Sequence, residues 1–159
     1  RSIELSALIQ HLPTDYQYVS LQKEVRDIDK PVLETSTNLL HFGNDLDDFT
    51  DTAALCELMD VVISVDTSVA HLSGALGKPT WVLLPFNPDW RWLLDRVDSP
   101  WYPSVKLYRQ PRVGDWGSVF VKLKADIAQI RSRNASPTLR HVFGHLVDKL
   151  GYQSRDRVR

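Results

Sequence analysis

The stretch Val61–Pro79, with the sequence VVISVDTSVAHLSGALGKP, decides the fold class. It opens with Val61–Val65, a continuous run of mostly β-branched apolar residues. Such a run is typical of a strand covered on both faces, as in a parallel sheet with helices above and below it. We therefore expect a central strand that leads to Asp66, at the carboxyl edge of a parallel sheet.

A helix is predicted directly after this strand. Thr67 and Ser68 are both preferred N-cap residues, and apolar residues then recur at helical spacing. Gly77 fits a left-handed C-cap, and Pro79 prevents the helix from continuing. This order places the carboxylate of Asp66 beside the N-terminus of a helix.

The rest of the sequence alternates between helix and strand patterns, apart from residues 23–37, where weak patterning predicts a loop. The alternation predicts an α/β domain with a parallel sheet. Helices are expected over residues 5–12, 51–59 and 116–130, the last capped by Asp115, and strands over residues 16–21, 38–42, 80–84 and 105–108.

The first pattern in the sequence is a helix, whereas a doubly wound domain ordinarily begins with a strand. In the usual strand order that first strand lies in the middle of the sheet. We therefore expect a Rossmann-like doubly wound parallel sheet that lacks its first strand and has a gap at its centre.

The composition argues against several classes of protein. The 159 residues are 43% hydrophobic with a formal net charge of −1, which indicates neither disorder nor a nucleic-acid partner. The single cysteine, Cys56, allows no disulfide and lies in a helical pattern, which favours a core position and a reducing compartment. Neither a membrane span nor a signal peptide is evident, so we expect a cytoplasmic protein.

Charge is distributed unevenly along the chain. Residues 1–130 carry 12 Lys and Arg against 18 Asp and Glu, whereas residues 131–159 carry 7 against 2. Arg131–Pro137 fits a linker and Leu139–Leu150 an amphipathic helix. We expect a domain over residues 1–130, then a basic linker and C-terminal helix that docks on a hydrophobic patch rather than on a membrane surface.

The strongest candidate site follows the strand that ends before Asp66. In open α/β sheets, ligands bind beyond the carboxyl ends of the strands, where helix N-termini offer free N–H groups to a phosphate. Thr67 and Ser68 suit a diphosphate, and His71 lies one helical turn further on. The carboxylate of Asp66 suits sugar hydroxyls instead. The alternative is that Asp66 only caps the helix and that His71 is a surface residue.

Other polar motifs are weaker. Asp45 and Asp47 have the Asp-x-Asp spacing of some divalent-cation sites, but acids at helix starts are far commoner, so we expect no metal. Gln22 and Lys23 follow the strand over residues 16–21 and put an amide and a cation at a second strand end, although a solvated lysine is the simpler interpretation. No Gly-x-Gly-x-x-Gly motif supports a nicotinamide or flavin cofactor.

Two aromatic segments, Asp89–Trp92 and Ser99–Pro103, place three Trp and one Tyr after the strand over residues 80–84. Loops with several large aromatic side chains either seal the edge of a core or line a ligand site. The sequence leaves both interpretations open.

At this point the sequence resembles a known family. It resembles the C-terminal part of bacterial tetratricopeptide-repeat proteins with a glycosyltransferase domain, a domain similar to the heptosyltransferase family (glycosyltransferase family 9). The resemblance covers about residues 1–130, and the Asp-Thr-x-x-x-His segment is specific in this context. It is carried by Ile63–Pro85, Pro88–Trp92, Ser99–Pro103 and Leu107–Gln110.

The resemblance implies a GT-B fold, in which two Rossmann-like domains face each other and this one is the C-terminal, donor-binding half. It also implies transfer with inversion, no required metal, and no cofactor besides the nucleotide-diphosphate sugar used as substrate. By position, Asp66 corresponds to a contact with the donor sugar. Thr67, Ser68 and His71 correspond to contacts with the diphosphate.

The resemblance assigns further residues and partners. Gln22 and Lys23 correspond to residues that help neutralise the leaving group, so Lys23 and His71 are the expected catalytic residues. Leu55, in the helix that opens at Asp51, is expected near the nucleoside. The general base is expected on an N-terminal acceptor domain, so this part should bind donor without turnover. Expected partners are the donor, an unidentified protein or saccharide acceptor, and the acceptor and repeat domains of the same chain.

Two alternatives stay open beside a transferase. The domain could be a non-catalytic interaction module within a repeat scaffold, or an epimerase or other nucleotide-binding enzyme of similar architecture. The presence together of Asp66, Thr67 and His71 favours the transferase.

Overall fold

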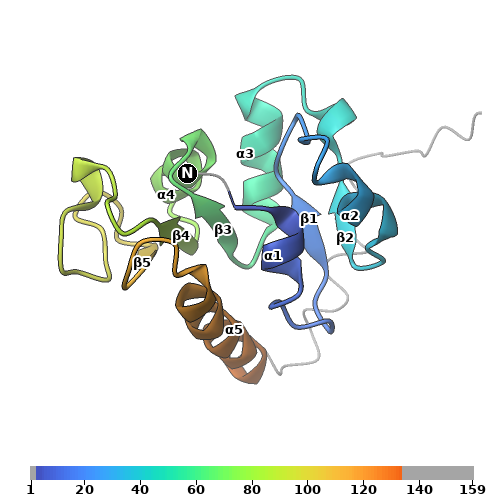
Figure 1. The fold of residues 1–159 in the computed structure, drawn as a ribbon. Coiled ribbons are helices and arrows are strands. Elements are labelled where there is room, and N and C mark those ends of the chain that lie inside the picture. Colours follow the sequence, from blue (N-terminus) through green and yellow to red (C-terminus); the bar gives the residue numbers. More distant parts are fainter. Residues whose placement is uncertain (1–2, 134–159) are drawn as a thin grey trace, which may run out of the picture. The chain divides into compact units, whose positions relative to one another are not determined.

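The computed structural model describes residues 3–133 (Figure 1). The chain divides into two compact units, residues 1–125 and residues 126–159. The first unit contains every strand named below. The C-terminal helix expected over residues 139–150 lies outside the described residues, so its docking stays a prediction.

Helices and strands alternate along the chain, as the sequence predicts. All strand pairs are parallel. The fold is therefore of the α/β class with a Rossmann-like alternation. In order, the elements are α1 (Leu5–Ile9), β1 (Tyr18–Ser20), α2 (Lys30–Thr35), β2 (Leu39–His41), a 3-10 turn (Gly43–Asp45), α3 (Phe49–Leu58), β3 (Val62–Val65), α4 (Ser68–Ala75), β4 (Thr80–Leu84), a 3-10 turn (Trp90–Trp92), β5 (Val105–Arg109) and α5 (Trp116–Arg133).

The strands form two separate parallel sheets. One sheet pairs β1 with β2, and the other has the order β3-β4-β5. In Figure 1, β1 lies between β3 and β2, so the break in the sheet falls between β1 and β3. The usual strand order of a doubly wound domain places its first strand at this position. The break therefore matches the gap that the sequence predicts.

β3 lies at the edge of its sheet, so the prediction of a central strand covered on both faces is wrong. Val62 is buried, but Ile63 and Val65 are only half-buried. The central strand is β4, four of whose residues are buried. An apolar run alone does not distinguish an edge strand from a central one. Within residues 3–133, β4 is hydrogen-bonded to a strand on each side, whereas β3 is hydrogen-bonded on one side only.

The short helix α2 replaces part of the loop expected over residues 23–37, so that prediction is wrong. Pro31 stands in its first turn, where its missing N–H is not needed and its fixed φ favours a helix. The N-cap residue Asp29 is buried and accepts hydrogen bonds from Leu5 N–H at 2.8 Å and from Arg26 Nε at 2.7 Å. A helix of six residues is too short to show an amphipathic repeat, so the sequence pattern misses it.

The ends of the longer helices are capped, at Asp115 and Gly77 as predicted and at Asp48 by a box that the sequence analysis did not name. Asp48 and Asp51 form a reciprocal capping box at the start of α3. At the start of α5, Asp115 accepts hydrogen bonds from the backbone and side chain of Ser118. Gly77 has a φ of 75° just beyond α4, as expected for a left-handed C-cap.

A cluster of buried hydrophobic side chains joins β4 and β5 to α4 and the Trp90–Trp92 turn. Cys56 of α3 is also fully buried, which confirms a core position, and burial raises the pKa of its thiol. The cluster consists of Ala70, Val82, Leu84, Trp92, Val105 and Leu107, with Tyr102 packed against it.

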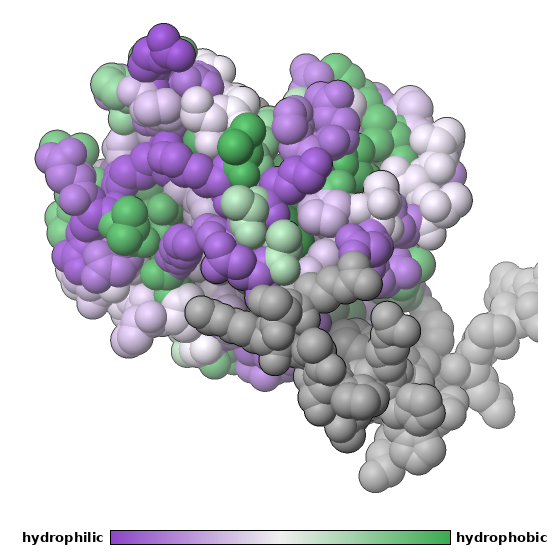
Figure 2. Space-filling view, turned by 90° about the horizontal axis from the view of Figure 1, so that it is seen from below, coloured by the Kyte–Doolittle hydropathy of each residue, from purple (hydrophilic) through white to green (hydrophobic). Residues whose placement is uncertain are grey.

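The described surface mixes polar and apolar residues. Figure 2 shows hydrophobic areas separated by hydrophilic ones on the face that it draws. Within residues 3–133, no helix combines the length and the apolar character that crossing a membrane requires. The last helix, α5, runs to Arg133, so the linker expected from Arg131 begins as helix.

Candidate functional site

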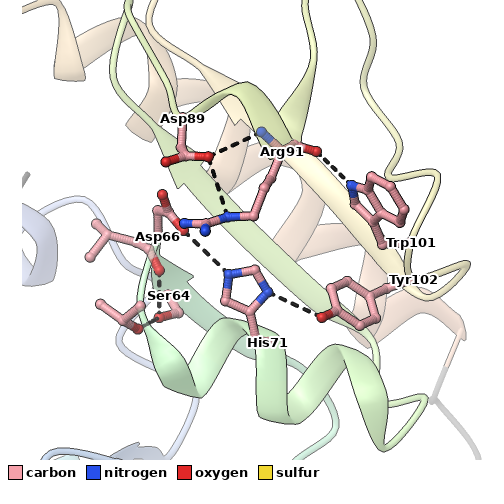
Figure 3. A network of polar contacts seen from close by, with 9 residues as sticks. Ser64, Asp66, His71, Asp89, Arg91, Trp101 and Tyr102 are labelled. Carbon is pink, nitrogen blue, oxygen red and sulfur yellow. Dashed lines mark hydrogen bonds and ion pairs between the residues drawn. The ribbon is translucent and has the colours of Figure 1, made fainter.

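Asp66 and His71 lie together at the carboxyl end of β3 (Figure 3). Thr67 is the N-cap of α4, with extended backbone, and His71 follows on the first turn of the helix. The Nε2 atom of His71 lies 3.5 Å from Oδ1 of Asp66. The Asp66 side chain is only 6% exposed, whereas that of His71 is 31% exposed. Asp66 and His71, which the sequence analysis placed in one candidate site, are therefore in contact.

His71 is also held by two aromatic side chains. Its Nδ1 atom lies 3.1 Å from the hydroxyl of Tyr102, and its ring stacks on Trp92 with centroids 5.2 Å apart. Both ring nitrogens thus have a partner within the protein. Neither aromatic contact follows from sequence spacing. Trp92 and Tyr102 lie in the segment between β4 and β5, which folds back onto α4.

A glycine allows this loop to approach the helix. A Cβ atom at Gly74 would lie 2.8 Å from Cγ of Tyr102, closer than atoms pack. Tyr102 therefore packs directly on the backbone of α4, one turn after His71. Trp92 is fully buried on the same side of the sheet. These contacts fix the loop on the helix and support the interpretation that its aromatic residues seal a core edge.

Other aromatic residues of the same loop are exposed. Trp90 is 73% exposed and Trp101 56% exposed, and Trp101 donates its indole N–H to the carbonyl of Arg91 at 2.7 Å. Asp89 accepts from the backbone N–H of Arg91 at 3.1 Å and pairs with its Nε at 3.3 Å. Figure 3 shows the Arg91 side chain extending toward Asp66 and His71. Sequence reasoning missed Arg91, which it named only as part of an aromatic segment.

The start of α4 keeps donors available. The hydroxyl of Thr67 lies 3.0 Å from that of Ser64 and does not cap the helix. Ser68 is exposed. Within residues 3–133, no protein group accepts a hydrogen bond from the backbone N–H of Ser68 or Val69. Free N–H groups at a helix start carry partial positive charge and suit an anion.

Two other predicted site residues, Gln22 and Lys23, follow β1, and a third, Leu55, lies on α3. Lys23 donates its ammonium N–H to the carbonyl of Asp47 at 3.1 Å, and the backbone N–H of Gln22 contacts the Ser20 hydroxyl at 3.4 Å. Both side chains are exposed, and Leu55 is half-buried on α3. The described contacts do not link these three residues to the Asp66–His71 pair. Their role in one common site stays a prediction.

Gly43 is required where Lys23 turns away from β1. A Cβ atom at Gly43 would lie closer than atoms pack to both the Lys23 carbonyl oxygen and the His41 ring. The end of β2 and the segment after β1 can therefore approach closely only with glycine here. This contact holds the backbone of Lys23 at the carboxyl end of its own sheet.

The acidic run before α3 includes the residue that caps this helix, Asp48. Hydrogen bonds from Thr50 hold the pKa of Asp48 below its usual value, which is expected of an N-cap carboxylate. The residues described contain no group of three or more His, Cys, Asp or Glu arranged to hold a metal ion, Asp45 and Asp47 included.

Comparison with known proteins relates the chain to a glycosyltransferase. It is 33% identical over 106 residues to the putative lipopolysaccharide heptosyltransferase 4 of Escherichia coli strain K12, a match that covers 64% of this chain and 25% of that protein. It is 36% identical over 69 residues to Protein FlbA of Caulobacter vibrioides, which covers 43% of this chain and 11% of that protein. The chain therefore spans a quarter or less of either relative. No family model and no solved structure matches.

Proposed function

We propose that this chain is the nucleotide-sugar-binding part of an inverting, metal-independent glycosyltransferase of the GT-B class, related to heptosyltransferases and associated with tetratricopeptide repeats. The observation that carries the proposal is the pairing of Asp66 with His71 beside the open start of α4. The heptosyltransferase match supports the same class of chemistry. In this proposal the donor is bound by residues 1–130.

The start of α4 is suited to the diphosphate. As the bond from the sugar to the nucleoside diphosphate breaks, negative charge develops on the β-phosphate, and preorganised donors at that position lower the barrier. The backbone N–H groups of Ser68 and Val69 are such donors. The Thr67 hydroxyl joins them when it releases Ser64, whose own proton goes to the Val65 carbonyl. An ionised carboxylate only accepts hydrogen bonds and repels a phosphate. We therefore assign Asp66 to hydroxyls of the donor sugar.

Lys23, Gln22 and Leu55 complete the proposed donor site. Lys23 supplies a cation for the leaving group, Gln22 an amide donor, and Leu55 an apolar contact for the nucleoside. One N–H of the Lys23 ammonium bonds to the Asp47 carbonyl, and the group has two further donors for a phosphate. His71 already uses both ring nitrogens, so we assign it a role through its neighbours. The base that deprotonates the acceptor belongs to a separate acceptor domain, and the described part alone binds donor without transfer.

The proposal is tested by a screen of UDP-, GDP- and ADP-sugars with the intact cytoplasmic protein, with release of nucleoside diphosphate and product stereochemistry as readouts. One donor class is expected to turn over with inversion and without added metal. Asp66→Asn should abolish most turnover, because the amide has no charge and replaces one of the two acceptor oxygens by a donor. Asp60→Asn is the matched control, since Asp60 is exposed at the other end of β3. Turnover that is equal in both variants refutes the assignment of Asp66.

A non-catalytic interaction module is the second candidate. Exposed apolar side chains on one loop favour it, since such patches mark interaction sites. Leu94 is 73% exposed and Val97 69% exposed, close in sequence to the exposed Trp90. A module of this kind binds none of the three nucleoside diphosphates, so binding of any one at the Asp66 end of β3 excludes it as the sole function.

A further inference from the structure

We propose that Tyr102 is a positioning residue of the candidate site: its hydroxyl fixes the tautomer and orientation of His71, and His71 in turn holds Asp66. The effect on ligand binding rests on the proposed function above. The effect on His71 does not, and it is measured separately.

The hydrogen-bond chemistry of the three groups sets the direction of the chain. An ionised carboxylate only accepts hydrogen bonds, so the His71 nitrogen that faces Asp66, Nε2, carries the proton. In the neutral ring, Nδ1 is then an acceptor, and the hydroxyl of Tyr102 donates to it across 3.1 Å. Removing the Tyr102 hydroxyl leaves Nδ1 without its donor. The tautomer protonated on Nε2 is then favoured by Asp66 alone.

Packing fixes the direction of the Tyr102 hydroxyl. The Tyr102 ring rests on α4 at Gly74 and meets His71 edge to face, with centroids 5.8 Å apart and planes at 60°. Its carbonyl accepts the N–H of Val105 at 3.0 Å, where β5 begins. Trp92 covers the other side of the imidazole. The imidazole is therefore enclosed by groups with little freedom to move.

The consequence for the site is a division of roles. With both nitrogens engaged, His71 offers no free N–H to a diphosphate, whereas the N–H groups of Ser68 and Val69 are open. His71 acts by holding the nearly buried carboxylate of Asp66 beside the helix start. The loop that carries Tyr102 thereby sets the geometry of a site that lies on β3 and α4.

The test uses the intact protein with ¹⁵N-labelled histidine rings. His71 is identified by the resonance that disappears in His71→Asn. In wild type we expect the neutral tautomer of the ring to carry its proton on Nε2. In Tyr102→Phe, we expect the Nδ1 resonance to move downfield, as it does when a ring nitrogen loses a donor. Tyr18→Phe is the matched control, because it removes a tyrosyl hydrogen bond, 2.7 Å to the Pro13 carbonyl, away from the site.

A second variant guards against a simple loss of structure. Gly74→Ala keeps the Tyr102 hydroxyl but displaces its ring, so it should alter the same His71 resonances. The proposal is overturned if Tyr102→Phe and Gly74→Ala both leave the His71 ring resonances as in wild type. It is equally overturned if Tyr18→Phe shifts them as much as Tyr102→Phe does.

Ligand affinity is the second readout. For the nucleotide sugar of whichever of UDP, GDP or ADP binds wild type, Tyr102→Phe should weaken binding by about two- to tenfold, the scale of one hydrogen bond, because Asp66 is assigned to the sugar. Equal affinity in both proteins overturns the effect on binding. If wild type binds none of the three, the proposed function fails, and the ring resonances still decide whether Tyr102 positions His71.

Discussion

The two sheets of this protein are stabilised by different means. Around β3–β5, most of the buried side chains are apolar, and Trp92, Val82 and Leu84 are fully buried. In residues 3–45, which carry β1 and β2, only Asp29 and Gly43 are buried. There, a network of polar contacts connects the chain segments. Asp29 accepts hydrogen bonds from Leu5 and Arg26, and Arg26 also donates to the Ile3 carbonyl at 2.8 Å.

The difference shows which part of the candidate site is preorganised. Apolar burial is the dominant stabilising term in folding and holds side chains in one rotamer. Asp66, His71 and Tyr102 stand on that part of the molecule. Lys23 and Gln22 stand on the part whose apolar residues are at most half-buried, so they can move further when a ligand binds.

The largest expected effect is the loss of the buried tryptophan. Trp92→Ala should reduce the free energy of unfolding by about 3–5 kcal/mol. The indole N–H of Trp92 has no hydrogen-bond partner among the described residues, so the substitution removes burial and stacking only. Trp90→Ala, at a 73% exposed position, is the control and should leave stability nearly unchanged. Urea denaturation measures both. Equal losses would contradict an apolar core centred on Trp92.

The polar network of the β1–β2 part gives the next effect. Asp29→Ala should cost about 1–3 kcal/mol, because the N–H of Leu5 is left without its acceptor. Asp27→Ala is the control, since Asp27 pairs with Lys30 at the surface, where such pairs contribute little. Hydrogen exchange should show faster opening of β1 and β2 in Asp29→Ala with β4 unaffected. Uniform acceleration in both sheets would show that they open together.

Gly74→Ala tests the contact between the aromatic loop and α4. The added methyl group meets Tyr102, and overpacking of this kind costs about 1–3 kcal/mol. Gly117→Ala is the control in α5, where the nearest atom lies 3.8 Å from the new Cβ and alanine favours the helix. Thermal unfolding should separate the two variants. A neutral Gly74→Ala would mean that Tyr102 does not rest on the helix.

The smallest effect concerns pH. Burial raises the pKa of the Cys56 thiol, so the folded protein holds this proton more tightly than the unfolded chain. Its contribution to stability is therefore complete below the unfolded pKa of about 8.5 and is lost as pH rises through the folded pKa. Stability measured between pH 7 and 10 should fall less steeply in Cys56→Ala. Labelling by a thiol reagent at pH 8 should be slow in the folded protein and fast in urea.

The sequence predicted correctly those helices and strands whose limits are set by neighbouring residues, such as prolines and capping residues. β4 was predicted at its observed bounds because an apolar run stands between Pro79 and Pro85. The start of α4 after Asp66 was predicted from capping preferences. The position of β3 at a sheet edge was not, because an edge is defined by a neighbouring strand and not by the residues of the strand itself.

The candidate site was predictable only where its members are close in sequence. Asp66 and His71 are five residues apart, and the helix that joins them fixes their contact. Tyr102 lies 31 residues from His71, and its approach depends on Gly74 and on the path of the loop. Lys23 was noted at the end of a strand, but its catalytic role came from the resemblance, so its place in a common site with Asp66 and His71 stays a prediction.

The most direct test is a map of where a nucleoside diphosphate binds. Backbone amide shifts of the intact protein are recorded while UDP, GDP or ADP is added. The proposal predicts that one nucleotide shifts Ser68, Val69 and His71 most strongly, and that Asp66→Asn leaves the location unchanged but weakens binding of the corresponding nucleotide sugar. A nucleotide that binds while leaving residues 66–71 unshifted would contradict the assignment of the site.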